Sequence, residues 1–334
     1  MRLSYYDGNN FKEIEKTKLY SEWASKSVYS DEYYDIYLKY LIKYSFDIVH
    51  IHHLIFHTFD LPKLCKELNI PLILSIHDLY FICQAYTLLD GDLRFCGGDC
   101  KNSNSEKECF LPMHNITKIK SVKTFVKEWR KLVYEMFLCV DFFIMPSNFL
   151  KNIILDNYNL SEDKILIIEH GIDFDQSNQN LFEVPDLNKP VKILFLGNLY
   201  LQKGVPIIKE LFEIDYEKKL EFHFLGFIPQ ELFNMRINHG VYENKELGEY
   251  IKQIRPSFIG IFTLCGEGYC YTLSEAWSFG IPVLVSKLGA LDERVSQNGG
   301  GWFIDVNDVN YSYSKIISII NNIVPNRTIL KIFL

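Results

Sequence analysis

The sequence predicts an α/β protein with two doubly wound domains, each built on a parallel sheet. Two observations indicate this class: short apolar runs typical of strands buried on both faces, and segments with helical spacing between those runs. The chain has 334 residues, enough for two domains of ordinary size. We expect residues 1–173 to form the first domain, residues 174–190 a polar linker with two prolines, and residues 191–334 the second domain.

The first half contains the apolar runs that predict its sheet. Each run ends in polar or small residues, and the runs cover 47–53, 71–77, 141–147 and 164–170. Between the first two runs, leucines at helical spacing predict a helix over 59–70, which completes a βαβ unit. The opening residues, RLSYYDGNNFKEI, do not resemble the first strand of such a domain. We therefore expect a shortened N-terminal domain.

The second half repeats the pattern after the linker. Predicted strands cover 191–197, 220–226, 257–264, 281–286 and 301–305, and predicted helices cover 205–214, 245–254, 271–280 and 290–297. Open α/β sheets bind ligands at the carboxyl ends of their strands. Residues just past strands are therefore the first candidates for chemistry: His52, His77, Gly197, Gly226 and Glu267.

Composition narrows the class of protein. Hydrophobic residues make up 48% and charged residues 23% of the chain, which is typical of a globular protein and excludes overall disorder. A net charge of -7 argues against general nucleic-acid binding. Apolar runs are shorter than a membrane-spanning helix needs, and the start lacks a signal peptide, so we expect a cytoplasmic protein. Eight cysteines in a chain of this length do not indicate a disulfide scaffold.

The segment 266–295 carries the strongest functional signal. Glu267 and Glu275 lie on either side of the predicted start of a helix near Tyr271 and Thr272. A helix N-terminus suits a diphosphate because its amides are unpaired and its dipole is positive there. Ionised carboxylates accept hydrogen bonds from sugar hydroxyls. The spacing of the two acids alone is also compatible with a structural role, in which Glu267 is a charged loop residue and Glu275 is an acid in the first helical turn that the helix dipole favours.

The sequence EGYCYTLSEAWSFGIPV (267–283) resembles a motif of the GT-B glycosyltransferases, specifically of glycosyltransferase family 4. The matching positions are Glu267, Glu275, Ala276, Gly280, Pro282 and Val283, followed by Gly289, Glu293 and Gly300. The resemblance implies two Rossmann-like domains that face a cleft. It also implies retaining transfer of a sugar from a UDP-, GDP- or dTDP-sugar to a carbohydrate or lipid-linked acceptor, without metal or cofactor, in cell-surface polysaccharide synthesis.

The resemblance also implies roles for single residues. GNLYLQKG (197–204) is similar to the family's donor loop, in which Lys203 would face the diphosphate and Asn198 stands where the family has arginine. Glu267 would hold the transferred sugar, Glu275 the ribose, and His77 the sugar near the reacting carbon. The catalytic candidates are His77, Glu267 and Lys203. The donor-binding candidates are Gly197, Asn198, Lys203, Gly226, Tyr242, Gly268, Tyr271, Thr272, Leu273 and Glu275.

Other interpretations stay open. The function could be that of a nucleotide-sugar epimerase with the same architecture, or of a non-catalytic nucleotide-binding subunit of a split transferase. The cysteines Cys83, Cys96, Cys100 and Cys109 fit a small zinc site, unpaired thiols or a disulfide. The basic, aromatic segment 117–137 fits either a helix packed through its apolar stripe or a peripheral contact with the inner face of a membrane. Ser147 is interpreted as a helix N-cap.

Overall fold

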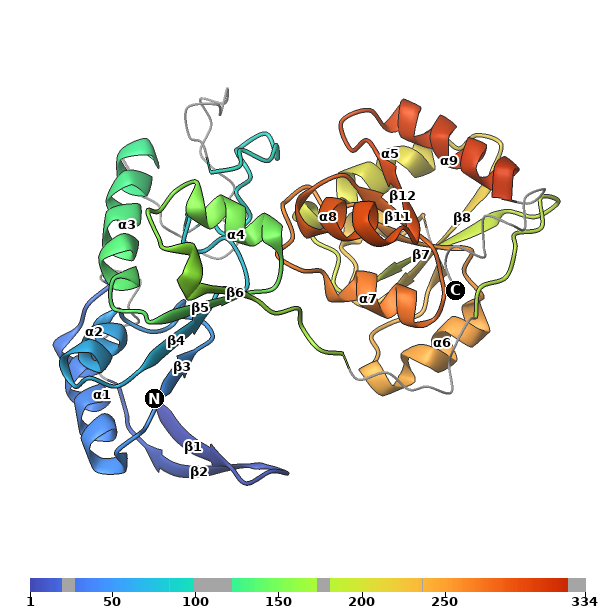
Figure 1. The fold of residues 1–334 in the computed structure, drawn as a ribbon. Helices are drawn as coiled ribbons and strands as arrows, with labels where there is room; N and C mark the ends of the chain where they lie inside the picture. Colours follow the sequence, from blue (N-terminus) through green and yellow to red (C-terminus); the bar gives the residue numbers. More distant parts are fainter. Residues whose placement is uncertain (20–27, 84, 99–121, 173–180, 236, 324–334) are drawn as a thin grey trace.

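The computed structural model describes residues 1–19, 28–83, 85–98, 122–172, 181–235 and 237–323 (Figure 1). Each half contains a parallel sheet. The first has the order β3(Val49–Ile51)-β4(Leu72–Ser75)-β5(Phe142–Met145)-β6(Ile165–Ile167). The second has the order β12(Gly301–Ile304)-β11(Val283–Ser286)-β10(Phe258–Ile261)-β7(Val191–Leu196)-β8(Leu220–Leu225)-β9(Ile237–Asn238). The predicted α/β class is confirmed.

Both faces of the second sheet are covered, as its apolar strands predict. Its helices are α5(Val205–Ile214), α6(Leu247–Ile254), α7(Tyr271–Ser278), α8(Gly289–Asn298) and α9(Val309–Ile323). Along β7, Ile193 and Phe195 belong to the core shared with α5 and α9. Leu194 and Leu196 belong to the core shared with α6, α7 and α8. Because side chains alternate along a strand, one apolar run supplies both cores.

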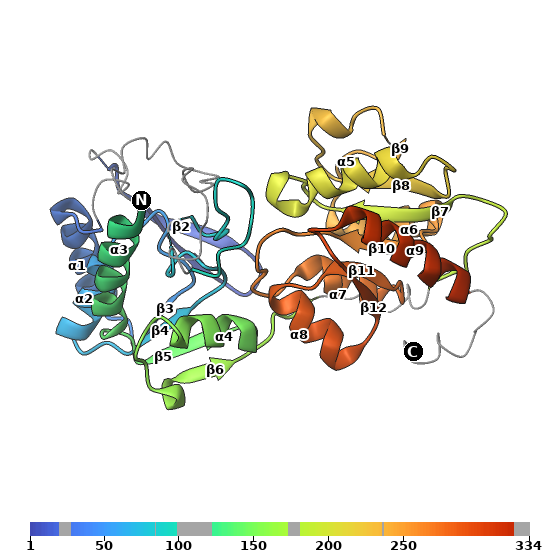
Figure 2. The ribbon, with the colours of Figure 1, turned by 90° about the horizontal axis from the view of Figure 1, so that it is seen from above.

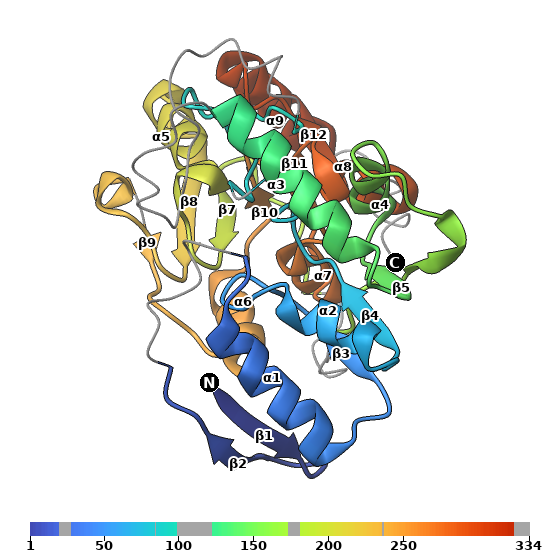
Figure 3. The same cartoon turned by 90° about the vertical axis from the view of Figure 1, so that its left-hand side faces the viewer.

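The first half begins with an antiparallel hairpin, β1(Arg2–Tyr6) and β2(Phe11–Lys16), which is separate from the parallel sheet. Figure 3 shows the hairpin beside α1(Asp31–Tyr44). Glu15 of β2 fixes this contact because its carboxylate pairs with both Lys39 and Lys43 of the helix. The chain therefore does not open with a strand of the parallel sheet, in agreement with the sequence.

Figure 2 shows α1, α2(Asp60–Glu67) and α3(Val122–Phe137) together on one side of the first sheet. In α3, Val126, Trp129 and Val133 are buried, and the Trp129 indole donates a hydrogen bond to the Tyr80 carbonyl at 3.1 Å. The apolar stripe is therefore packed within the protein over this part of the helix. Lys118 and Lys120 lie outside the described residues. No helix in the ranges given above is both long enough and apolar enough to cross a bilayer.

The two halves meet along α4(Asn148–Leu155) and α8. Ser147 caps α4, as predicted, by accepting a hydrogen bond from the Leu150 amide at 3.3 Å. The same hydroxyl donates to the Gly268 carbonyl at 2.7 Å, across the boundary between the halves. The Glu293 carboxylate of α8 accepts from the backbone amides of Asn148 and Phe149, at 3.0 and 2.7 Å. A carboxylate from one half thus satisfies the open amides of a helix in the other.

Candidate functional site

Two glycine turns form one wall of the site, after β7 and β8. Gly197 and Gly226 have φ values of +85° and +129°, and a Cβ on Gly226 would lie 2.2 Å from the Gly197 carbonyl oxygen. Only glycine fits this close approach of two backbones. The Asn198 side-chain oxygen accepts a hydrogen bond from the Phe227 amide at 3.3 Å. Asn198 therefore links the two turns.

Lys203 lies in the short 3₁₀ turn Leu201–Lys203, directly before α5. The turn ends at Gly204, whose φ is +86° and where a Cβ would lie 2.1 Å from the Phe262 carbonyl oxygen. The Leu264 amide donates to the Gln202 carbonyl at 2.8 Å. These backbone contacts fix the turn that carries Lys203 against the carboxyl end of β10.

Lys203 and Glu267 form the central ion pair of the site, with Nζ and Oε1 2.5 Å apart. Partial burial disfavours the charged amine, but the Glu267 carboxylate more than offsets this and raises the pKa of Lys203 above its ordinary value. The backbone of Glu267 is fixed as well, because its carbonyl accepts from the Ala290 amide at 2.8 Å. The structure thus brings together two predicted site residues that are 64 positions apart in the sequence.

The turn before α7 is held by Arg294, a residue that sequence reasoning missed. Its guanidinium is buried and donates to the carbonyls of Tyr269 and Cys270 at 3.0 and 3.1 Å, and to the Ser274 hydroxyl at 2.7 Å. Cys270 has a φ of +74°, which is strained for a residue other than glycine. Every residue type has a backbone carbonyl, so the sequence does not indicate which carbonyls Arg294 binds.

The first turn of α7 offers its backbone to the site. Helix α7 starts at Tyr271, which is exposed, and Thr272 is half-buried. Leu273 is fully buried in the core, so only its backbone could contact a ligand. The amides of the first turn have no partners within the helix and carry its positive dipole. This geometry fits the predicted diphosphate position.

Glu275 and Tyr242 form a second pair of predicted residues. Glu275 is half-buried, and burial raises the pKa of its carboxyl group. Burial, together with the negative charge of Glu275, raises the pKa of Tyr242 to about 12. Within the described part of the chain, no donor is hydrogen-bonded to the Glu275 carboxylate. The Glu275 carboxylate is therefore able to accept hydrogen bonds from hydroxyl groups of a ligand.

His77 lies in a row of imidazoles. Its Nε2 is 3.3 Å from Nδ1 of His52, and its Nδ1 is 3.4 Å from Nε2 of His170. Burial, with the neighbouring His170 and His52, lowers the pKa of His77 to about 4, so the ring is neutral at pH 7. The backbone of His77 touches the loop of Glu267, because a Cβ on Gly268 would lie 2.4 Å from the His77 carbonyl oxygen. The structure therefore places His77 against the loop that carries Glu267.

The zinc interpretation of the four cysteines is not tested by the described residues. Cys83 and Cys96 lie within the described residues, whereas Cys100 and Cys109 lie outside them, so the zinc interpretation stays a prediction. Within residues 1–323, apart from the gaps already given, no group of three or more His, Cys, Asp or Glu side chains is arranged to hold a metal ion. Cys270 adjoins the site, and burial raises the pKa of its thiol to about 12.

Comparison with known proteins adds an independent finding. Residues 13–176 match the family model described as Glycosyltransferase Family 4, and residues 177–330 match the model described as Glycosyl transferases group 1. An uncharacterized 41.2 kDa protein in the cps region of Klebsiella pneumoniae is 23% identical over 212 residues, which are 59% of this chain and 57% of that protein. An uncharacterized glycosyltransferase of Methanocaldococcus jannaschii is 25% identical over 191 residues, which are 54% of this chain and 50% of that protein. The chain thus spans about half the length of these relatives.

Solved structures share the arrangement of both halves. A glycosyltransferase from Rickettsia africae superposes with a TM-score of 0.62 at 18% identity, covering 96% of this chain and 77% of that one. HepE from Anabaena, solved in complex with UDP, superposes with a TM-score of 0.58 at 11% identity, covering 88% of this chain and 72% of that one. At these identities the likeness shows a common fold.

Proposed function

Because the chain belongs to glycosyltransferase family 4 and has the GT-B fold, we propose that it transfers a sugar from a nucleotide-sugar donor to a carbohydrate or lipid-linked acceptor, with retention of the anomeric configuration. The observation that carries this proposal is the Lys203–Glu267 pair beside the start of α7. UDP bound to HepE supports a nucleotide donor, and the relative encoded in a cps region supports a role in cell-surface polysaccharide synthesis.

In the proposed reaction, negative charge develops on the leaving diphosphate as its bond to the anomeric carbon breaks. Lys203 and the amides of the first turn of α7 would stabilise that charge. Groups held in place before the reaction are effective because they need no reorganisation when the charge appears. Here the turn of Lys203 is fixed by a backbone hydrogen bond from Leu264 to Gln202, and the turn before α7 is fixed by hydrogen bonds from the Arg294 guanidinium.

The remaining candidates would recognise the rest of the donor. Glu267 accepts hydrogen bonds from the transferred sugar, and Glu275 accepts them from the ribose. Hydroxyl donors would stabilise the ionised form of Glu275 and offset the effect of burial on its pKa. Tyr242 would contact the base, and the neutral ring of His77 would contact the sugar as donor or acceptor.

The proposal is tested with the full chain and UDP-, GDP- and dTDP-glucose as donors. Nucleotide binding is measured by calorimetry, and donor turnover is measured with acceptor glycans. Glu267→Gln and Lys203→Met should each lower kcat/KM by about 10²-fold or more, because each removes a charge that faces the reacting groups. The matched controls are Glu213→Gln and Lys209→Met, which break an exposed pair on α5. Unchanged turnover in either site variant would refute the assigned roles.

The same assays separate the alternatives. An epimerase would convert the donor sugar without any acceptor, whereas a non-catalytic subunit would bind nucleotide and transfer nothing. The observation that favours the non-catalytic alternative is in the first half. Its described residues form a parallel sheet of four strands, preceded by a hairpin. Retention is checked by NMR, since the product of a retaining enzyme has the anomeric configuration of the donor.

We also propose that the enzyme works in the cytoplasm, at the inner face of the membrane when its acceptor is lipid-linked. Lys127 and Lys131 on α3 are exposed and would face anionic headgroups. Cosedimentation with vesicles containing phosphatidylglycerol should then decrease when both lysines are replaced by glutamine. Equal binding of the variant would exclude this surface.

A further inference from the structure

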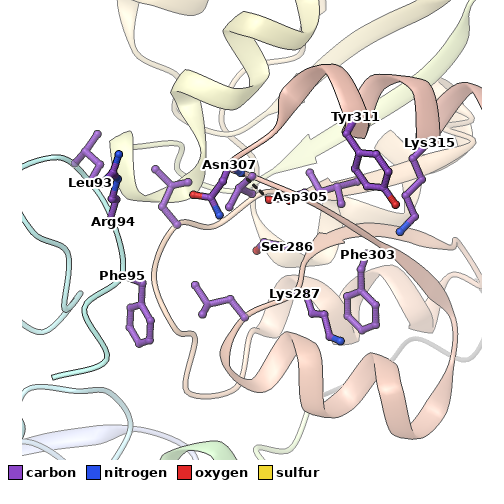
Figure 4. Close-up of a pocket in the computed structure, with 14 residues that line it drawn as sticks. Leu93, Arg94, Phe95, Ser286, Lys287, Phe303, Asp305, Asn307, Tyr311 and Lys315 are labelled. Carbon is purple, nitrogen blue, oxygen red and sulfur yellow. Dashed lines mark hydrogen bonds between the residues drawn. The ribbon is translucent and has the colours of Figure 1, made fainter. Parts of the chain in front are cut away.

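A cavity apart from the proposed donor site lies at the carboxyl ends of β11 and β12 and has a volume of about 520 Å³. Lys203, Glu267 and Glu275 are not among the residues that line it. Figure 4 shows Arg94 and Phe95 at the edge contributed by the first half, with Lys287 and Lys315 on the second half. We propose that this cavity binds a saccharide that carries an oxyanion, either a phosphate or a carboxylate.

The charge of the cavity favours an anion. Arg94, Lys287 and Lys315 line it with a single carboxylate, Asp305, so the local charge is +2 in a chain whose net charge is -7. Within the described residues, no carboxylate forms an ion pair with any of the three cations. Lys287 and Lys315 instead lie over the rings of Phe303 and Tyr311, each with Nζ 5.7 Å from the ring centre. Unneutralised cations that line one cavity from separate elements attract an anionic ligand.

The walls favour a ligand larger than a simple ion. Leu93, Phe95 and Val306 supply apolar surface, and Phe303 and Tyr311 supply aromatic rings, against which the C–H face of a sugar could pack. Asn307 adds an amide that can donate to or accept from hydroxyls. The cavity therefore combines apolar and aromatic surface with polar and charged groups, which suits the mixed surface of a charged sugar.

Ser286 provides an independent observation. Its side chain is fully buried at the wall of the cavity, and its hydroxyl oxygen has no hydrogen-bond partner within the described part of the chain. Buried polar groups are nearly always hydrogen-bonded, so an unpaired one needs an explanation. A polar ligand seated in the cavity would supply the missing partner.

The cavity is assembled by contact between the halves. Leu89 of the first half is fully buried in the core of the second half, and Leu93 and Phe95 pack against the same core. The Asp90 carboxylate accepts from the Arg94 amide at 3.0 Å and so fixes the turn that presents Arg94. The edge supplied by the first half is therefore held in place without a ligand.

The cavity also adjoins the proposed donor site. Leu288 lines it, and the next residue, Gly289, lies so close to Glu267 that a Cβ there would be 2.6 Å from the Glu267 amide nitrogen. A ligand in the cavity would therefore contact the segment that supports Glu267. Binding at this second site does not require the proposed transfer reaction, so the two proposals can fail separately.

The test is calorimetry on the full chain with four probes: glucose 6-phosphate, glucuronate, glucose and inorganic phosphate, each up to about 10 mM. We expect at least one anionic sugar to bind, and glucose and phosphate to bind about tenfold more weakly or not at all. The anionic sugar that binds more tightly identifies the oxyanion. Binding should weaken as NaCl is raised from about 50 to about 500 mM. Absence of binding by both anionic sugars, or equal binding of glucose, overturns the proposal.

Variants locate the binding. Lys287→Met with Lys315→Met should weaken binding by about tenfold or more, and Lys209→Met on α5 serves as the control. Ser286→Ala should weaken binding without lowering the thermal midpoint, because it removes an unpaired hydroxyl. Binding should survive both Lys203→Met and saturating UDP. Loss of binding in either of these two cases would place the sugar in the donor site and refute the second site.

Discussion

Replacing Arg294 with methionine should destabilise the second half strongly, because this buried guanidinium holds the turn before α7. The change removes hydrogen bonds to two backbone carbonyls, at 3.0 and 3.1 Å, and one to the Ser274 hydroxyl at 2.7 Å. Hydrogen bonds from a charged donor contribute about 1.5–3 kcal/mol each, and they are not additive within one group. Methionine keeps much of the buried volume. We therefore expect a loss of about 3–5 kcal/mol, or roughly 10 °C in thermal midpoint.

The assay is thermal unfolding followed by circular dichroism, with UDP affinity measured on the same samples at a temperature where all variants are folded. Arg294→Lys should lie between the wild type and Arg294→Met, because an ammonium keeps the charge and loses the planar fork. Arg2→Met is the control, since its ion pair with Glu13 is exposed. A midpoint of Arg294→Met within about 2 °C of the wild type would refute the assigned role.

Three further perturbations test other parts of the structure. The pKa of His77 is lowered to about 4, so between about pH 6.5 and 4 the folded state binds fewer protons than the unfolded state. The free energy of unfolding should therefore fall by about 1–2 kcal/mol as pH decreases through that window. In His77→Gln the urea midpoint should depend less on pH. Gly204→Ala should lower the thermal midpoint more than Gly240→Ala, because both have positive φ but only the first Cβ would clash with Phe262; equal effects would contradict the clash. Glu293→Ala should lower stability in urea by about 1–3 kcal/mol by removing the acceptor for the amides of α4, and an unchanged urea midpoint would show that this contact between the halves contributes nothing.

The sequence predicted most elements of the second half, because its local and tertiary signals agree there, but it did not predict β9 or α9. The helix predicted over 205–214 is observed at those bounds, and β7 and β8 each lie within a predicted run. These strands are buried on both faces, so nine of their twelve residues are apolar. The predicted ends of these two strands extend one residue past the observed ends, since Gly197 and Gly226 belong to the turns at the candidate site.

The first half was harder to predict. Helix α1 buries three tyrosines and two aliphatic residues at helical spacing, but tyrosine also occurs often in strands and on surfaces. The hairpin of β1 and β2 is mostly exposed, so it has no apolar run to indicate it. Its position depends on ion pairs of Glu15 with α1, and such long-range pairs are not visible in a local pattern.

The candidate site likewise contains residues that the sequence indicated and contacts that only the fold creates. Family resemblance indicated Lys203 and Glu267, whereas the row formed by His77, His52 and His170 was not predicted as a unit. His52 and His77 follow the adjacent strands β3 and β4, whereas His170 follows β6, which β5 separates from β4, so its contact with His77 depends on the path of the chain after β6. The functional roles of all the site residues stay predictions until the variants are measured.

The segment 266–270 couples the two halves, and this affects how any donor is held. Phe149 of the first half packs so closely on Gly266 that a Cβ there would lie 2.6 Å from its ring, and Ser147 bonds to the Gly268 carbonyl. Arg294 fixes the following carbonyls from the second half. Glu267 therefore lies on a backbone segment that is held by contacts from both halves. The Lys203 ammonium lies 2.5 Å from the Glu267 carboxylate and has three N–H donors, so a donor phosphate can bind the same group through donors that Glu267 does not use.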